Sequence, residues 1–231
     1  MRNPDGLVRL GMLALPLASL LALAGLYSAL KLGSGGILAT GDNRAIVSTG
    51  YFVSVLFGNV LALTVLIFGV VALYAYLAKG GQRTLALGAM ASSIVGISLM
   101  LSRAGVFAYA VPALSRSFLD GKPESIMIVD SIFAGPVGTV ESVSSLLYSA
   151  GFFLFGIAIW RSGVLPGWAG VLIAVHAPLI TGPVPLVGSV AGALLALVGG
   201  GWIAFSVLRD TPGRTESRST PRAGRASSRE I

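Results

Sequence analysis

The chain has 231 residues, of which 55% are hydrophobic and only 11% are charged, and it contains no cysteine. A soluble fold of this composition would lack the polar surface needed to cover its apolar interior, so part of its surroundings must be lipid. The formal net charge of +7 belongs to cations that flank apolar stretches or lie near the C-terminus, a distribution typical of membrane topology and not of nucleic-acid binding.

Six apolar stretches are long enough to cross a bilayer as helices. A hydrocarbon core about 30 Å thick requires roughly 20 apolar residues in helical form. We therefore predict an all-α, polytopic transmembrane helix bundle at residues 1–208, followed by a disordered basic tail at residues 209–231. The predicted spans are Leu7–Leu30, Tyr51–Ala78, Leu85–Ala110, Thr139–Trp160, Trp168–Val187 and Ser189–Leu208.

The first span follows two arginines, so a cleaved signal peptide is the alternative to a membrane anchor. The apolar run from Leu10 to Leu30 is longer than the roughly 7–15 residues usual in a signal peptide, and no small-residue cleavage site follows it. We expect this segment to remain as a span.

Ser125–Val137, between the third and fourth spans, is apolar but too short to cross a bilayer. Asp130, Gly135 and Pro136 interrupt it. An apolar run of about 10–14 residues is typical of an interfacial or re-entrant segment. We expect an amphipathic helix on the outer face, with a re-entrant segment lining a cavity as the alternative.

Few polar side chains fall within the apolar stretches, and each is a candidate for function because polar groups in lipid are costly. The candidate polar pocket consists of Asn59, Arg103, Asp130, Glu141 and His176. We expect these residues to gather toward the outer half of the bilayer. Either Arg103 reaches the outer head groups while Glu141 stabilises the first turn of its helix, or the two form a structural ion pair, or they line a functional cleft.

The histidine and the stripe of small residues in the last span each permit two interpretations. His176 lies two residues before Pro178, so it is either a packed side chain bonded to backbone or a proton relay or axial ligand. The last span places small residues every four positions, which allows close helix packing within the chain or between two copies. These residues are Gly188, Gly192, Ala196, Gly200 and Ala204.

The cations set the predicted orientation. If six spans alternate, eleven cations share the side of the N-terminus and four lie on the other side. The positive-inside rule then places both termini in the cytoplasm, in an inner (plasma) membrane. We expect the tail arginines to contact anionic lipid head groups, and we expect no binding of nucleic acid.

The fourth span and the turn after it carry one recognisable pattern. Phe152–Trp160 is an aromatic helix end, and Arg161–Gly170 follows the pattern Arg-x-Gly-x-Leu-Pro-x-Trp before the next helix. This arrangement resembles a family of uncharacterised bacterial six-helix membrane proteins catalogued as a domain of unknown function. The resemblance implies the six-helix fold and brings no reaction, cofactor or binding site with it.

Three classes of function remain open on the sequence. No phosphate-binding loop, nucleophile elbow or buried lysine is present. The leading hypothesis is a membrane protein that binds or moves a small lipophilic molecule through an outward-facing polar pocket, without a cofactor. The alternatives are an intramembrane enzyme that acts on a lipid or isoprenoid with a carboxylic acid, and a structural subunit of a membrane assembly.

Overall fold

A computed structural model of the protein describes residues 4–31, 43–182 and 185–209. Within these ranges the chain forms helices joined by turns and contains no strand. The predicted all-α polytopic bundle is therefore confirmed. The predicted tail lies outside the described residues, apart from Arg209.

Five of the helical segments are long and apolar enough to cross a membrane. They are Gly6–Ser28, Thr49–Lys79, Arg83–Leu119, Val137–Ser162 and Val187–Arg209. A sixth apolar helix, Gly167–Thr181, is shorter. The chain thus passes six times along the bundle, with one pass shorter than the sequence predicts.

The first pass is divided into helices α1 (Pro4–Met12) and α2 (Ala14–Lys31). The break at Leu13 is explained by Pro16, which has no N–H and whose ring collides with the carbonyl four residues earlier, that of Met12. Bonding resumes from the N–H of Leu17 to the carbonyl of Leu13, at 3.2 Å.

The second pass contains the short helix α3 (Asn43–Ile46), then α4 (Thr49–Val55), the π-helix η1 (Leu56–Leu61) and α5 (Ala62–Lys79). Ser48 caps α4 by accepting a hydrogen bond from the backbone N–H of Tyr51 at 3.2 Å. A tight turn at Gly80 and Gly81 ends α5, and Gly81 adopts a φ of 84°, which a residue with a Cβ rarely adopts.

The third pass is longer than predicted. Helix α6 (Arg83–Gly105) continues through the π-helix η2 (Val106–Ala110) into α7 (Val111–Leu119), nine residues beyond the predicted end at Ala110. Pro112 does not end this helix because it is the second residue after the π segment, where the ordinary bonding to the fourth preceding residue is already interrupted.

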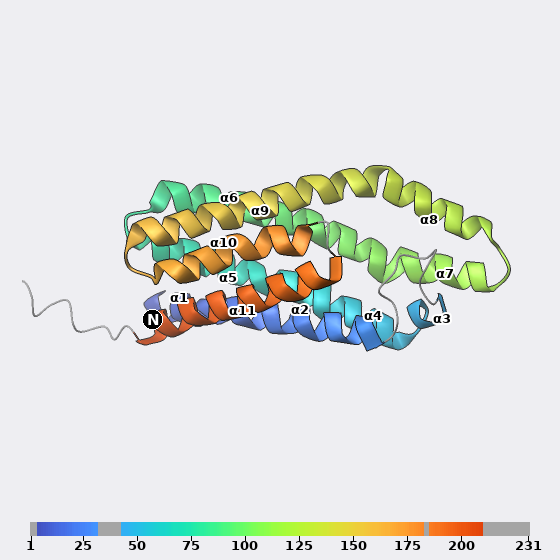
Figure 1. Cartoon of the computed structure of the whole chain (residues 1–231), viewed down its shortest axis with the longest axis horizontal. Helices are drawn as coiled ribbons and strands as arrows, with labels where there is room; N and C mark the ends of the chain where they lie inside the picture. The colour runs from blue at the N-terminus through green and yellow to red at the C-terminus, as the bar shows by residue number, and fades with distance from the viewer. Residues whose placement is uncertain (1–3, 32–42, 183–184, 210–231) are drawn as a thin grey trace, which may run out of the picture.

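The segment predicted to be interfacial or re-entrant is helix α8 (Glu124–Ala134), which follows a turn at Gly121 and leads into α9 (Pro136–Ser162). It packs against α7 and α9 and runs along the bundle with them (Figure 1). It therefore lengthens a helical hairpin and does not lie across the end of the bundle. The break at Gly135 is short, and Pro136 suits the first position of the next helix, so the chain keeps its direction.

The fifth pass, α10 (Gly167–Thr181), is shorter than the predicted span Trp168–Val187. Its 15 residues give a length of about 22 Å, less than the thickness of a hydrocarbon core. Gly182 has extended backbone, as expected of a residue that precedes a proline. The last helix, α11 (Pro185–Arg209), accordingly begins four residues before the predicted start at Ser189.

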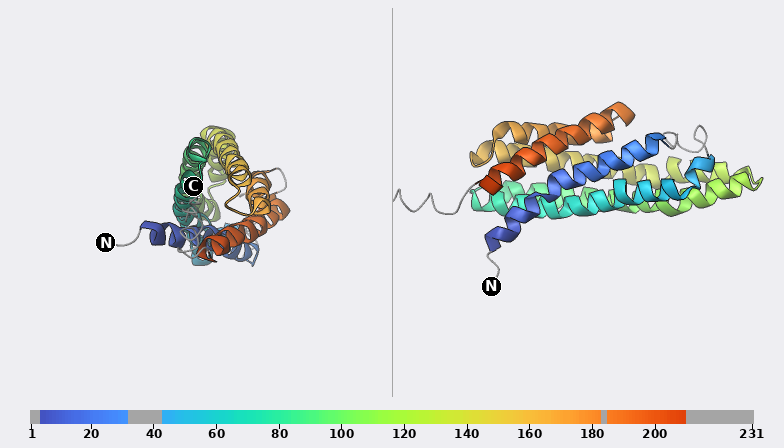
Figure 2. Two further views of the ribbon diagram at one scale, coloured as in Figure 1. Left: turned by 90° about the vertical axis from the view of Figure 1, so that its left-hand side faces the viewer. Right: turned by 90° about the horizontal axis from the view of Figure 1, so that it is seen from below.

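The six passes close into a ring, because each long helix packs against the next. The order around the ring is α2, α5, α6, α9, α10 and α11, and α11 packs against α2 again. Figure 2 (left) shows the view along this bundle. Large buried side chains fill the interior, among them Leu73, Phe152, Phe155, Ile173 and Ile203.

The two ends of the bundle differ in charge and in shape. The described chain begins and ends at the same end (Figure 1), which we call the basic end because it carries Arg9, Lys79, Arg83, Arg161 and Arg209. At the other end, the hairpin end, α3, α7 and α8 project beyond α10 and α11 (Figures 1 and 2). There a second small core joins residues from α3, α4, η2 and α7, namely Ile46, Tyr51, Val55, Ala108 and Val111.

Candidate functional site

Arg103 and Glu141 lie at the same height in the bundle, on the neighbouring helices α6 and α9. Arg103 follows Arg83 by 20 residues, and Glu141 precedes Arg161 by 20 residues. At a helical rise of about 1.5 Å per residue, both lie about 30 Å from the basic end, which is one hydrocarbon thickness. The pair therefore lies at the far edge of the apolar layer, and the projecting hairpin continues beyond it.

The two side chains form an ion pair, as two of the three alternatives left open by the sequence require, namely a structural ion pair and a functional cleft. Nη2 of Arg103 lies 2.9 Å from Oε1 of Glu141, and the side chains are 33% and 42% exposed. The Arg103 guanidinium also lies over the ring of Phe107, 4.8 Å from its centre. Glu141 thus neutralises a cation inside an apolar pass, where an unpaired charge would be costly.

The ion pair leaves part of the guanidinium unused. Nε of Arg103 is buried and has no hydrogen-bond partner among the described residues. Arginine and carboxylate side chains frequently pair through two parallel hydrogen bonds. Here Nε makes no such bond, and because it is buried, a further acceptor would have to reach the exposed part of the Arg103 side chain.

Two π-helical turns lie at the height of the ion pair. The segment η2 begins three residues after Arg103, and η1 contains Asn59, which precedes Lys79 by 20 residues. Single turns of π-helix inside α-helices are rare and are often found at functional sites. The ion pair and the two π-helical turns thus lie in one layer, at the hairpin end of the apolar core.

Asn59 and Asp130 add nothing to the ion pair that the structure describes. Asn59 is exposed on the outside of the bundle. Asp130 belongs to α8, but its side chain lies outside the described part of the structure. Of the four candidates whose side chains the structure describes, Arg103 and Glu141 are in contact.

His176 is part of a separate, buried cluster. Its Nδ1 bonds to the backbone carbonyl of Ile173, so this nitrogen carries the proton, and Nε2 accepts from the hydroxyl of Tyr148 at 3.0 Å. The imidazole also meets the ring of Phe152 edge-on, with ring centres 4.7 Å apart. Both ring nitrogens are satisfied and the side chain is 2% exposed, so His176 is the packed histidine bonded to backbone.

The sequence-based prediction includes His176 but not Tyr148, its partner across the bundle. Tyr148 lies on α9, 28 residues earlier in the chain, and is 3% exposed. The available signal is a tyrosine within an apolar helix, since a buried hydroxyl requires a partner. Because His176 is the only histidine in the sequence, it is the one imidazole with which such a tyrosine could pair.

The small residues of the last span pack within the chain. A Cβ on Gly192 would lie 2.6 Å from the side chain of Ile180, on α10. A Cβ on Gly200 would lie 3.0 Å from the Cβ of Leu15, on α2. Gly188 is likewise against Leu179, whereas Ala196 is half-buried. The stripe therefore joins α11 to its two neighbours in the ring and gives no support to a dimer interface.

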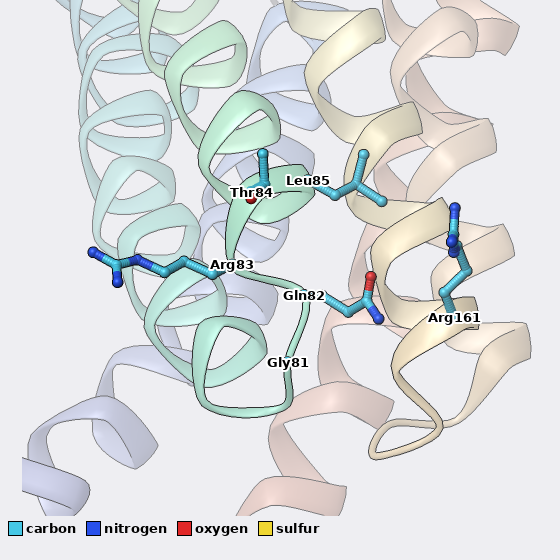
Figure 3. A pocket seen from close by; sticks show the side chains of 6 residues that line it. All are labelled: Gly81, Gln82, Arg83, Thr84, Leu85 and Arg161. Atoms are coloured by element: carbon cyan, nitrogen blue, oxygen red, sulfur yellow. The ribbon is translucent and has the colours of Figure 1, made fainter.

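Two surface hollows lie away from the ion pair. One is at the basic end, lined by Gly81–Leu85 and Arg161 (Figure 3), and the other is an apolar groove between α9 and α10. Neither is lined by a residue of the predicted polar pocket. Within the described residues, no group of three or more His, Asp or Glu side chains is arranged to hold a metal ion.

Comparisons with family models, curated proteins and solved structures find no match. The resemblance to the bacterial six-helix family therefore stays a prediction. Function has to be argued from the geometry of this chain alone.

Proposed function

We propose that this membrane protein binds the anionic head of an amphiphilic molecule at Arg103, at the hairpin end of its apolar layer. The exposure and position of Arg103 carry the proposal. Its side chain is one-third exposed, pairs with Glu141 through Nη2, and lies where a head group meets the hydrocarbon. A tail attached to that head would extend along the apolar helices below.

Glu141 has a second role in this proposal, as the acceptor that an incoming head group must displace or share. Its side chain is 42% exposed, which makes the pair accessible without unfolding of the helices. Removing the charge of Arg103 should therefore weaken binding of the head group, whereas removing the charge of Glu141 should strengthen it. An ion pair with a structural role alone would show no such opposition.

The experiment is a titration of the purified protein with hexadecyl phosphate, followed by native mass spectrometry. Arg103→Gln should weaken binding by about tenfold, since a hydrogen bond to a charged group contributes roughly 1.5–3 kcal/mol. Glu141→Gln should tighten it by about threefold or more, because the competing carboxylate is neutralised. Arg116→Gln removes the same charge from the projecting α7 and is the matched control.

Two outcomes would contradict the proposal. One is equal loss of binding in Arg103→Gln and Arg116→Gln, which would indicate general attraction by positive charge. The other is a decrease in binding on Glu141→Gln. The melting temperature of each variant in the same detergent separates loss of binding from loss of folding.

We also propose that the basic end faces the cytoplasm of a bacterial cell, in the plasma membrane. The unequal distribution of cations between the two ends supports this orientation. The site at Arg103 would then face outward.

A further inference from the structure

The hollow at the basic end lies where two helices present polar groups to the same space. It measures about 360 Å³ and lies between the turn that joins α5 to α6 and the C-terminal end of α9. Figure 3 shows Gln82 and Leu85 on one side and Arg161 on the other, whereas Arg83 points in the opposite direction. This volume is near the lower limit of small-molecule sites, which are about 300–1,000 Å³.

The charge of the hollow is uncompensated. Within the described residues, neither Arg161 nor Arg83 has a carboxylate partner. Gln82, at the start of α6, lines the same space, and its side-chain amide carries two N–H donors. The backbone N–H groups of the first turn of α6 add further positive potential on that side. The hollow is thus complementary to an anion.

The surroundings of the hollow indicate what kind of anion it fits. Trp160, which precedes Arg161 in the chain, lines the neighbouring apolar groove and meets Trp168 with ring centres 6.0 Å apart. Both tryptophans are exposed at this end of the bundle, and tryptophan is enriched where lipid head groups meet the hydrocarbon. Leu85 supplies an apolar wall next to the polar groups. A free phosphate ion makes no use of an apolar wall, whereas the glycerol and upper acyl chain of a lipid do.

We propose that this hollow binds the phosphate of an anionic lipid in the leaflet at the basic end, with Arg161 as the main contact and Gln82 as a second donor. This site is separate from the one at Arg103, at the opposite end of the apolar layer. It gives the bundle a specific lipid contact in addition to the general attraction between its cations and the membrane.

Arg161 and Arg9 form a matched pair for the test, because they carry the same charge at the basic end and only Arg161 lines the hollow. The parent protein carries Arg103→Gln, which removes the other proposed anion site. The parent and its Arg161→Gln and Arg9→Gln derivatives are purified in non-ionic detergent and titrated with phosphatidylglycerol or phosphatidylcholine under native mass spectrometry. The parent should prefer phosphatidylglycerol by about tenfold. Arg161→Gln should abolish that preference, and Arg9→Gln should leave it within about twofold.

Equal loss in both variants would overturn the proposal, since it would show charge attraction without a site. Displacement of phosphatidylglycerol by millimolar inorganic phosphate would overturn the assignment to a lipid. A preference that survives Arg161→Gln would also contradict it. Unaltered melting temperatures confirm that the variants fold.

Discussion

At the scale of single residues, the ion pair and the histidine differ in how completely their polar atoms are used. Arg103 and Glu141 are partly exposed and make a limited contact, so their contribution to stability is small, on the order of 1 kcal/mol or less. Tyr148 and His176 are buried and fully bonded. A pair with exposed polar atoms is suited to binding a ligand, and a pair whose polar atoms are all bonded is suited to holding helices together.

The bond between Tyr148 and His176 leads to a prediction about stability. Tyr148→Phe leaves Nε2 of His176 buried without a donor, which costs about 1–3 kcal/mol. We expect a lower melting temperature in detergent, measured by tryptophan fluorescence. Tyr109→Phe is the control, because Tyr109 is 68% exposed and should change stability by no more than about 0.5 kcal/mol. An unchanged melting temperature for Tyr148→Phe would show that the bond contributes nothing.

At the scale of helices, close approach depends on glycine. Helix α2 crosses η1 at Gly25 and Gly58, where a Cβ on Gly58 would lie 2.5 Å from the Cα of Gly25. Helix α6 crosses α9 in the same way at Gly96, where a Cβ would lie 2.6 Å from the backbone nitrogen of Tyr148. In lipid, contacts of this kind hold helices together, because apolar side chains gain little by leaving hydrocarbon.

The crossing at Gly58 predicts opposite effects for two identical substitutions. Gly58→Ala should destabilise the protein by about 1–3 kcal/mol, because the backbone of Gly25 occupies the space of the new methyl group. Gly88→Ala should stabilise it by about 0.5–1 kcal/mol, because nothing lies within 4 Å of its Cβ position and alanine favours the helix. Thermal unfolding of both variants in one detergent measures this contrast. A gain in stability for Gly58→Ala would contradict the observed crossing.

At the scale of the whole molecule, an even number of passes places both ends of the described chain together, at the basic end. The projecting hairpin at the other end extends well beyond one bilayer. The pass from Arg83 to Leu119 has 37 residues, about 55 Å of helix against a core of about 30 Å. The excess places α7 and α8 beyond the apolar layer when Arg83 lies at its opposite edge.

The proposed orientation is testable because the chain has no cysteine of its own. Single-cysteine variants Lys122→Cys, in the hairpin turn, and Ser227→Cys, in the tail, are expressed in intact bacteria and treated with a membrane-impermeant maleimide. We expect labelling of Lys122→Cys in intact cells and of Ser227→Cys only after permeabilisation. The reverse pattern would mean that the basic end faces outward.

The sequence by itself determined the all-helical class, the apolar passes and the residues worth examining. Composition and run length decide these, because a bilayer requires about 20 apolar residues per pass and penalises each charge within it. The ends of the helices were harder to predict from the sequence. Helix α7 continues past Pro112 because of the π segment, whereas α10 stops at Thr181, before Pro183 and Pro185. The position of such an end depends on local backbone hydrogen bonding, which the length of an apolar stretch does not reveal.

Only the tertiary structure decided which polar groups are in contact and which small residues pack against a neighbouring helix. Arg103 pairs with Glu141 because α6 and α9 are neighbours in the ring, and His176 meets Tyr148 because α10 packs on the other side of α9. The glycines of α11 are covered by α10 and α2 for the same reason. Helix order around a ring depends on how side chains pack between passes, and no periodicity within one pass specifies its neighbours.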